Sequence, residues 1–213
     1  MVFNISYSKN RTIRKYFDNS MKILREFYSF NWNQNEPKLI LVPDRETFDK
    51  LVGEKTKGWN IASSDFAENI YLLSKENFER DSTHKYSKEE YTKTITHELS
   101  HKFFQTITDS HYPVWLDEGI AQYTAGQYKD YHVETFSKFL NLFDKMSSDS
   151  YTECAFAVKC LLDNFKKENL IKLLDSISKE EKTEKTFKKN FEAIYKIELS
   201  SESFNSLLKR GNK

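Results

Sequence analysis

The sequence predicts an α+β protein in which a small lobe of strands and helices comes first and a mainly helical lobe follows. Three short apolar runs bounded by turn residues, the pattern of buried strands, fall within residues 38–73. From Ser87 onward, apolar residues recur at the three- and four-residue steps of helices. The chain of 213 residues suits a single domain. We therefore expect one domain over 1–213, with an α/β lobe over 1–110 and a helical lobe over 111–213.

The first half should contain helices and strands in alternation. The run Lys38–Val42 is apolar and ends at Pro43, which indicates a buried strand. A helix before Gly53 should end at that glycine. The expected elements are a helix over 11–30, a strand over 38–42, a helix over 45–52, strands at Trp59–Ala62 and Asn69–Leu73, and a loop over 76–86.

The second half should be almost entirely helical. Ser87 stands three residues before Glu90, which is the pattern of a capping box at a helix start. The helix that it begins should run to about Thr108, with a loop around Pro113 after it. Further helices are expected over 115–128, 131–146, 150–165, 168–176, 184–195 and 201–208.

The segment His97-Glu98-Leu99-Ser100-His101 is an HExxH motif on the first of these helices. Four residues turn a helix through about 400°, so the two histidines lie one above the other and can bind one zinc ion. Glu98 is rotated by about 100° from this line, so it can reach a metal-bound water as a general base. With 5 histidines in the chain, such a motif is rare by chance.

A second segment lies just beyond this helix. Trp115-Leu116-Asp117-Glu118-Gly119-Ile120-Ala121-Gln122-Tyr123 resembles the WLxEGxAxY stretch of the gluzincin zinc metallopeptidases. The resemblance extends over residues 38–165, is closest to compact peptidase-MA-like domains, and implies a zincin-like fold with the active-site helix between two lobes. By this match Glu118 is the third zinc ligand, and one Zn²⁺ is expected per chain. Two histidines and one glutamate leave a position open for water, as catalysis requires.

A third segment carries the resemblance further. Tyr151 leads a helix start similar to one found downstream in the aminopeptidase branch of gluzincins, which would make it a hydrogen-bond donor to the oxyanion. Cys154 stands where that branch usually has glycine, and Lys102 stands where an uncharged residue is usual. Gln122 takes the place of an aspartate that orients a ligand histidine, and its carbonyl oxygen can accept an imidazole N–H.

The other histidines, cysteines and aromatic residues are expected to play ordinary roles. His84 should be an exposed loop residue, and His132 should begin a helix. For His111 we expect a loop residue, with transition-state stabilisation or metal binding as alternatives. The free thiols of two cysteines should be buried, because a six-residue spacing on a helix opposes a disulfide. The residues concerned are Cys154 and Cys160, and packing roles are expected for Tyr123, Phe136, Phe139 and Phe143.

Composition limits the partners. The 33 basic and 32 acidic residues nearly balance, giving a formal charge of +1, which argues against nucleic acid as the main partner. No apolar stretch has the length of a secretory signal or of a membrane span, so we expect a cytoplasmic protein. The expected partner is a peptide or protein substrate, and the oligomeric state is left open.

Three functions remain for this pattern. The first is a zinc-dependent peptidase, in which Glu98 takes a proton from water and passes it to the leaving amine. Its extended substrate would pair with an exposed strand edge at Ile70–Leu73. The second is a catalytically inert zinc-binding module with a regulatory role. The third is a helical protein whose motif is accidental; a metal assay separates it from the others.

Overall fold

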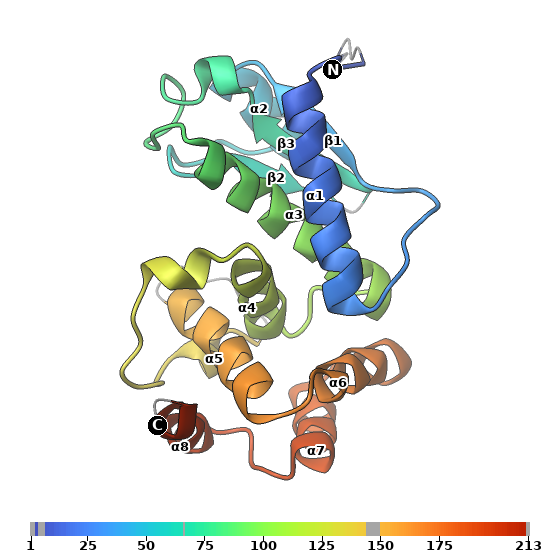
Figure 1. The fold of residues 1–213 in the computed structure, drawn as a ribbon, viewed down its shortest axis with the longest axis vertical. Coiled ribbons are helices and arrows are strands. Elements are labelled where there is room, and N and C mark those ends of the chain that lie inside the picture. Colours follow the sequence, from blue (N-terminus) through green and yellow to red (C-terminus); the bar gives the residue numbers. More distant parts are fainter. Residues whose placement is uncertain (1–2, 4–6, 66, 144–149, 212–213) are drawn as a thin grey trace.

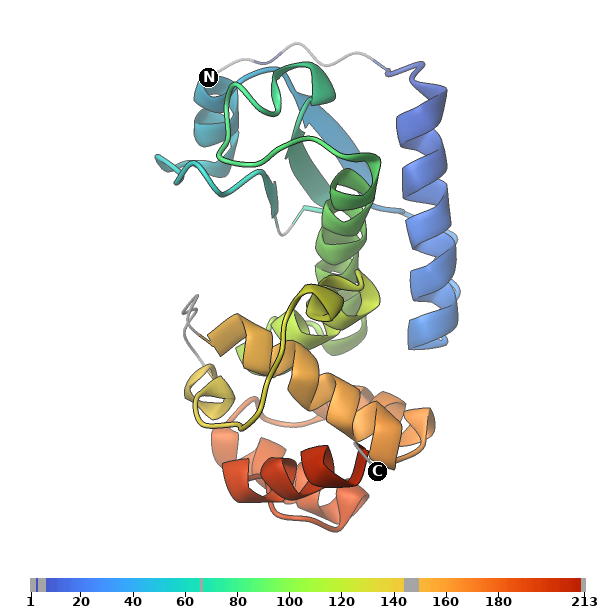
Figure 2. The same ribbon diagram turned by 60° about the vertical axis from the view of Figure 1, so that its left-hand side comes forward.

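The protein is described by a computed structural model over residues 3, 7–65, 67–143 and 150–211. It is dominated by helices and has a small sheet, which confirms the α+β class. The sheet lies in one part of the molecule and the later helices in the other (Figure 1). Helix α3 (Lys88–Thr108) runs from the sheet into the lower part, with α1 (Arg11–Tyr28) alongside it (Figure 2).

The sheet has three strands in the order β1-β3-β2. Strand β1 (Lys38–Val42) pairs in parallel with β3 (Asn69–Leu73), and the short α2 (Arg45–Val52) follows β1. Strand β2 (Ala62–Ser64) pairs antiparallel with the other side of β3. Two strand positions, 38–42 and 69–73, are therefore as the sequence predicts, and so is helix 45–52.

Two expectations about the sheet are wrong. The second strand along the chain is predicted at Trp59–Ala62 but lies at Ala62–Ser64. A turn closed by the Asn60 N–H and the Lys57 carbonyl precedes it and leaves Trp59 52% exposed. Strand β3 has neighbours on both sides, so Ile70–Leu73 is the centre of the sheet rather than its edge. The edges are β1 and β2.

Helix α3 begins and ends where the sequence predicts. The Ser87 side chain accepts a hydrogen bond from the backbone N–H of Glu90 at 3.0 Å, which caps the first turn. The last turn closes at Asp109, whose left-handed φ of 53° ends the helix. Residues 76–86, which precede helix α3, form a loop as predicted, except that the 3-10 turn η1 (Lys75–Asn77) ends within them.

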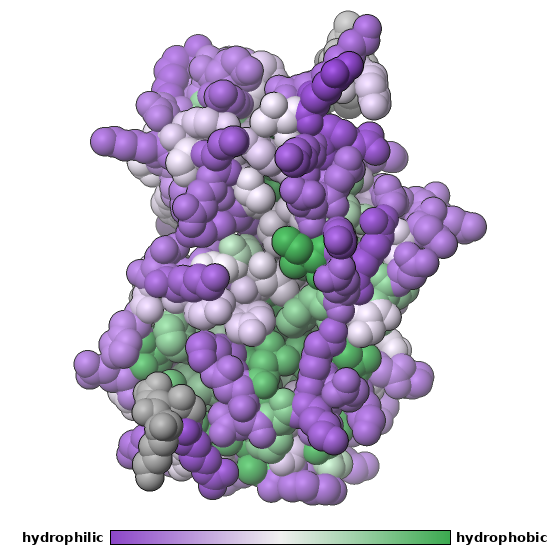
Figure 3. Space-filling view, in the orientation of Figure 1, coloured by the Kyte–Doolittle hydropathy of each residue, from purple (hydrophilic) through white to green (hydrophobic). Residues whose placement is uncertain are grey.

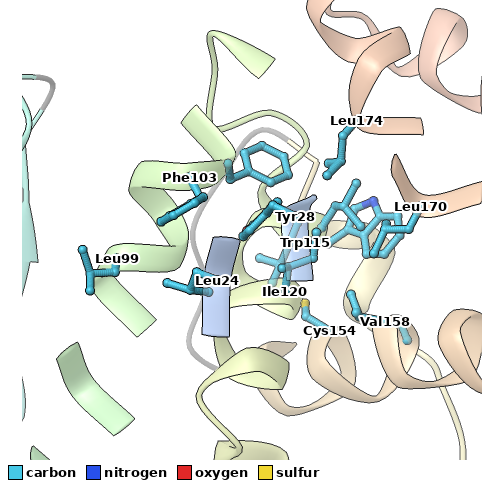
Figure 4. Close-up of a cluster of buried hydrophobic side chains, with 14 of the residues drawn as sticks. Leu24, Tyr28, Leu99, Phe103, Trp115, Ile120, Cys154, Val158, Leu170 and Leu174 are labelled. Carbon is cyan, nitrogen blue, oxygen red and sulfur yellow. The ribbon is translucent and has the colours of Figure 1, made fainter. Parts of the chain in front are cut away.

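Helix α1 packs along α3 through buried polar and aromatic contacts. The hydroxyls of Ser20 and Thr96 lie 2.7 Å apart, and the Tyr28 hydroxyl donates to the Ser100 carbonyl at 3.1 Å. The Tyr28 ring stacks on Phe103, with centroids 5.4 Å apart, inside the cluster drawn in Figure 4. These contacts fix the helix that carries the HExxH motif.

The described residues of the helical part form five α-helices at or near the expected positions. Helix α4 is shorter than predicted and ends at Thr124, because Gly126 adopts a left-handed φ of 74° and the short 3-10 turn η2 (Gln127–Asp130) follows. Trp115 is fully buried and meets Phe139 edge-on at 5.3 Å (Figure 4 shows its surroundings). The helices are α4 (Val114–Thr124), α5 (Tyr151–Asn164), α6 (Lys167–Lys179), α7 (Glu184–Tyr195) and α8 (Ser201–Gly211).

The predicted helix over 131–146 is wrong for its described residues 131–143, which contain only the 3-10 turn η3 (Phe139–Asn141). Residues 144–146 lie outside the described part. The Glu153 carboxylate accepts hydrogen bonds from three successive backbone N–H groups, at positions 137–139, and so removes them from any helix ladder. The aromatic residues Phe136, Phe139 and Phe143 are buried, as predicted.

The surface is mostly polar over the sheet part, and more apolar side chains show over the helices below it (Figure 3). Among the described residues, no helix is long and apolar enough to cross a membrane.

Helices α4 and α5 approach each other closely at Gly119. A Cβ atom added there would lie 2.5 Å from the Cys154 carbonyl oxygen and 2.8 Å from the Val158 side chain. Backbone cannot retreat as a flexible side chain can. The glycine next to Glu118 therefore lets α5 pack against the helix that carries that glutamate.

We predict that Gly119→Ala destabilises the protein, although alanine normally favours a helix. The clash with the α5 backbone should lower the free energy of unfolding by about 1–3 kcal/mol, the usual scale of overpacking. Denaturant unfolding followed by circular dichroism measures this. The control is Gly58→Ala, whose Cβ would meet only the Thr83 methyl at 3.2 Å. Equal stability of the two variants would contradict the close approach.

Candidate metal centre

Two helices bring three metal-binding side chains together. His97 and His101 lie on one face of α3, with Nε2 atoms 3.1 Å apart. Glu118, in the first half of α4, places one carboxylate oxygen 3.7 Å from His97 Nε2 and the other 3.8 Å from His101 Nε2. The sequence predicts these three residues as ligands, and the structure brings them together as a group that could hold a metal ion.

The hydrogen bonds of the two rings leave their facing nitrogens as electron-pair donors. His97 Nδ1 lies 2.8 Å from Gln127 Oε1, and His101 Nδ1 lies 2.8 Å from Asp117 Oδ1. Because a carboxylate and an amide oxygen only accept, each Nδ1 carries a proton, which leaves Nε2 as the nitrogen with which each ring can bind a metal when it is neutral. The two Nε2 atoms and the Glu118 carboxylate face one another, as the ligands of one metal ion would.

The spacing of these donors fits zinc. In a tetrahedral site with bonds of about 2.0–2.1 Å, neighbouring ligand atoms lie about 3.3 Å apart. The two histidine nitrogens are 3.1 Å apart, close to that value, and they lie 3.7 and 3.8 Å from different oxygens of the Glu118 carboxylate. Nitrogen and oxygen donors of these types are those that catalytic zinc sites use. The residues present therefore fit a three-ligand zinc ion with an open fourth position.

The pKa shifts of the three side chains reflect their burial and the negative charges beside them. Burial lowers the pKa of His97, and the neighbouring His101 lowers it further. Burial also acts to lower the pKa of His101, but the charges of Asp117 and Glu118 outweigh it and raise that pKa. Burial raises the pKa of Glu118 to about 7 despite the opposing effect of His101. The negative charges of Asp117 and Glu118 therefore favour a cation in this cluster.

Asp117 connects two histidines and is itself buried. Its second carboxylate oxygen lies 2.8 Å from His111 Nδ1, while the first accepts from His101. Burial acts to raise the pKa of Asp117, but His101 and His111 lower it overall, so the carboxylate stays ionised. His111 is therefore more than the ordinary loop residue expected from the sequence: it shares a carboxylate with a ligand histidine.

Gln122 is predicted to accept a hydrogen bond from the outer nitrogen of a candidate ligand histidine, but other residues do so. The outer nitrogens of both ligand histidines are already occupied, by Gln127 and by Asp117. Gln122 is buried in α4, but it takes neither of these positions. Asp117 could have been suspected because it precedes the third ligand. Gln127 lies beyond a left-handed glycine in η2, and no local motif marks it.

Glu98 lies off the ligand line and toward the sheet. It is half-buried, and burial raises its pKa although a hydrogen bond from Ser64, at the end of β2, opposes the shift. A carboxylate with a raised pKa is a stronger proton acceptor. One turn later, the fully buried Lys102 donates to the Asp65 carbonyl and, at 2.9 Å, to Gln105. The unusual lysine thus fastens the residue after β2 to α3.

Tyr151 is the first residue of α5 and is half-buried. Burial raises its pKa, and the charge of Glu118 adds to the shift, so the tyrosine lies within electrostatic reach of that carboxylate. The phenol is therefore protonated and able to donate a hydrogen bond.

The remaining candidates stand apart from the centre. Both cysteines are buried free thiols, as predicted, and Cys154 donates to the Ser150 carbonyl at 3.2 Å. His84 is exposed, as predicted, and its Nε2 lies 2.9 Å from the Trp59 carbonyl oxygen. His132 is exposed and lies in an irregular segment rather than at the start of the expected helix.

Comparisons of the chain with protein-family models, with curated proteins and with solved structures returned no match. The case for a function therefore rests on the residues of this chain.

We predict that the purified protein carries about one zinc ion per chain, as a three-ligand site implies. Glu118→Ala should lower the metal content sharply, and His97→Ala with His101→Ala should abolish it. Inductively coupled plasma mass spectrometry after dialysis measures the content. His84→Ala with His132→Ala, which removes two histidines elsewhere, is the matched control and should keep the full content. Full retention of zinc in the His97/His101 double variant would exclude this site.

Proposed function

We propose that the protein is a zinc-dependent peptidase with a zincin-like arrangement of the gluzincin type. The observation that carries the proposal is the convergence of His97, His101 and Glu118, with Glu98 on the same helix but off the ligand line. The sequence of the two motif segments supports the same class. A three-ligand set with an adjacent buried carboxylate is the equipment of metal-assisted hydrolysis.

A zinc ion bound by these residues would supply a water of pKa about 7 and would polarise a peptide carbonyl. Glu98 takes the proton of the attacking water on its carboxylate and then gives it to the leaving amine. Burial suits Glu98 for both steps, because its raised pKa lies closer to neutrality.

Tyr151 is proposed to stabilise the oxyanion that forms when water attacks. Its raised pKa keeps the phenol protonated at neutral pH, so it can donate at the moment when negative charge develops. The close packing of α5 on Gly119 places the start of α5 beside the helix of Glu118.

The edge of β2 is proposed to bind the substrate, in place of the buried β3 expected from the sequence. β2 is an edge strand, and its last residue, Ser64, contacts Glu98. An extended peptide that pairs with this edge would run past the carboxylate through backbone hydrogen bonds. In Figure 3 the outline is notched on its left, between the sheet part and the helical part.

We predict that Glu98→Gln abolishes peptide hydrolysis and leaves zinc content and thermal stability unchanged. Glutamine has the size of glutamate but cannot accept the proton, and it does not touch the ligand positions. Cleavage of an unbiased peptide mixture, read by mass spectrometry, measures activity for parent and variant together.

The control is Glu89→Gln, which removes an exposed carboxylate from the first turn of the same helix and should cleave like the parent. Equal cleavage by parent and Glu98→Gln would mean that another site or a contaminant is responsible. A parent that holds zinc but cleaves nothing would favour the inert zinc-binding module.

For Tyr151→Phe we predict a loss of about 10²-fold in turnover, the scale of removing one oxyanion donor. Zinc content and the unfolding temperature should not change, because only a hydroxyl is lost. Tyr123→Phe, which alters a half-buried tyrosine of α4, is the matched control. Unchanged turnover for Tyr151→Phe would assign Tyr151 to packing alone.

A further inference from the structure

Two parallel cross-links join α3 to the short turn η2. The first is the hydrogen bond between His97 and Gln127, at 2.8 Å. The second is the ion pair between Lys93 Nζ and Asp130 Oδ2, also at 2.8 Å. Lys93 lies one helical turn before His97, and Asp130 ends the turn that Gln127 begins. The two segments therefore run antiparallel, with one cross-link at each end of η2.

The lysine of this ion pair is more buried than the lysine of a typical surface pair. The Lys93 side chain is only 12% exposed, and three carboxylates surround its ammonium group. Glu89 and Glu90 belong to α3 itself, at 3.3 and 3.1 Å, so they do not join the helix to anything else. Asp130 is the one of these three that comes from another element.

The turn η2 has little structure of its own to hold its place. It spans four residues, begins after Gly126 at a φ of 74°, and ends in extended backbone at Tyr131. Its middle is fixed to α4, because the Tyr128 ring stacks on Tyr123 with centroids 5.1 Å apart. Its end is fixed to α3 by Asp130. Gln127 is the first residue of the turn, next to the Tyr128 attachment, and Asp130 holds the opposite end.

We propose that Lys93 and Asp130 are positioning residues that hold η2 so that Gln127 stays on His97 Nδ1 and fixes that ring for the metal. The inference rests on the proposed metal site and adds residues that act on it from outside. Groups that orient ligand histidines commonly change metal affinity by about 10–100-fold. Asp130 acts one step further away, through Gln127.

The test measures zinc affinity of the full chain by competition with a chromogenic chelator. Gln127→Ala should weaken zinc binding by about 10–100-fold. Asp130→Asn should weaken it by about threefold to tenfold, because the far end of η2, the turn that carries Gln127, is then no longer attached to α3. Glu90→Gln is the matched control: it removes an equal charge from the same ammonium group without breaking the link to η2, and it should bind zinc like the parent.

Two further variants separate positioning from general stability. Asp130→Glu keeps the charge and should recover most of the affinity. The double variant Gln127→Ala with Asp130→Asn should bind no more weakly than Gln127→Ala alone, because Asp130 acts through the missing amide. The visible absorption of the cobalt-substituted protein should change in Asp130→Asn and not in Glu90→Gln.

Parent-like affinity of Asp130→Asn, or additive losses in the double variant, would overturn the inference while leaving the peptidase proposal intact. A parent that binds no zinc would instead overturn the proposed function. In that case the inference is tested on the tautomer of the His97 ring, measured in long-range ¹H–¹⁵N spectra of the metal-free protein. His97 should be the Nδ1–H tautomer in the parent and in Glu90→Gln, and a mixture in Asp130→Asn. Identical tautomers in all three would overturn the inference.

Discussion

Two imidazole nitrogens of α3 face each other at 3.1 Å with a glutamate carboxylate beside them. The packing of the helices around this cluster holds its three side chains together. A cation bound among these atoms would offset the concentration of donors at one place. The arrangement persists because the outer nitrogens donate to Gln127 and Asp117, and because two well-packed helices carry the donors. Helix α1 fixes α3 through Tyr28 and Ser20, while α5 fixes α4 at Gly119.

The sequence predicts what is local in this site. The spacing of His97 and His101 determines that both share one helix face, and the Ser87 cap sets where that helix begins. Glu118 could be expected only from its resemblance to a known segment, since nothing local to α4 relates it to α3. Nothing local marks Gln127 as the partner of His97 or His111 as a second partner of Asp117, because both reach the site only through the packing of η2 and of the loop after α3.

The wrong expectations have the same origin. Residues 131–143 have the apolar spacing of a helix, but Glu153 and Asn205 capture their backbone N–H groups from helices distant in the chain. The apolar pattern correctly gives burial of Phe136 and Phe139 while failing to give the backbone conformation. Likewise Trp59 has strand propensity, yet the strand that pairs with β3 begins at Ala62, preceded by one backbone hydrogen bond from Leu73 to Ile61. Tertiary contacts outweigh local preference at these positions.

Helix α3 uses different faces for the two halves of the proposed chemistry. Lys93 and His97, one turn apart, are linked to η2 in the helical part. Glu98 and Lys102, also one turn apart, meet Ser64 and Asp65 at the end of β2. The candidate metal ligands are therefore oriented from the helical part and the proposed base from the sheet part. Because α3 is the rigid connection between them, a change in η2 can alter metal binding while the base and the β2 edge keep their relative positions.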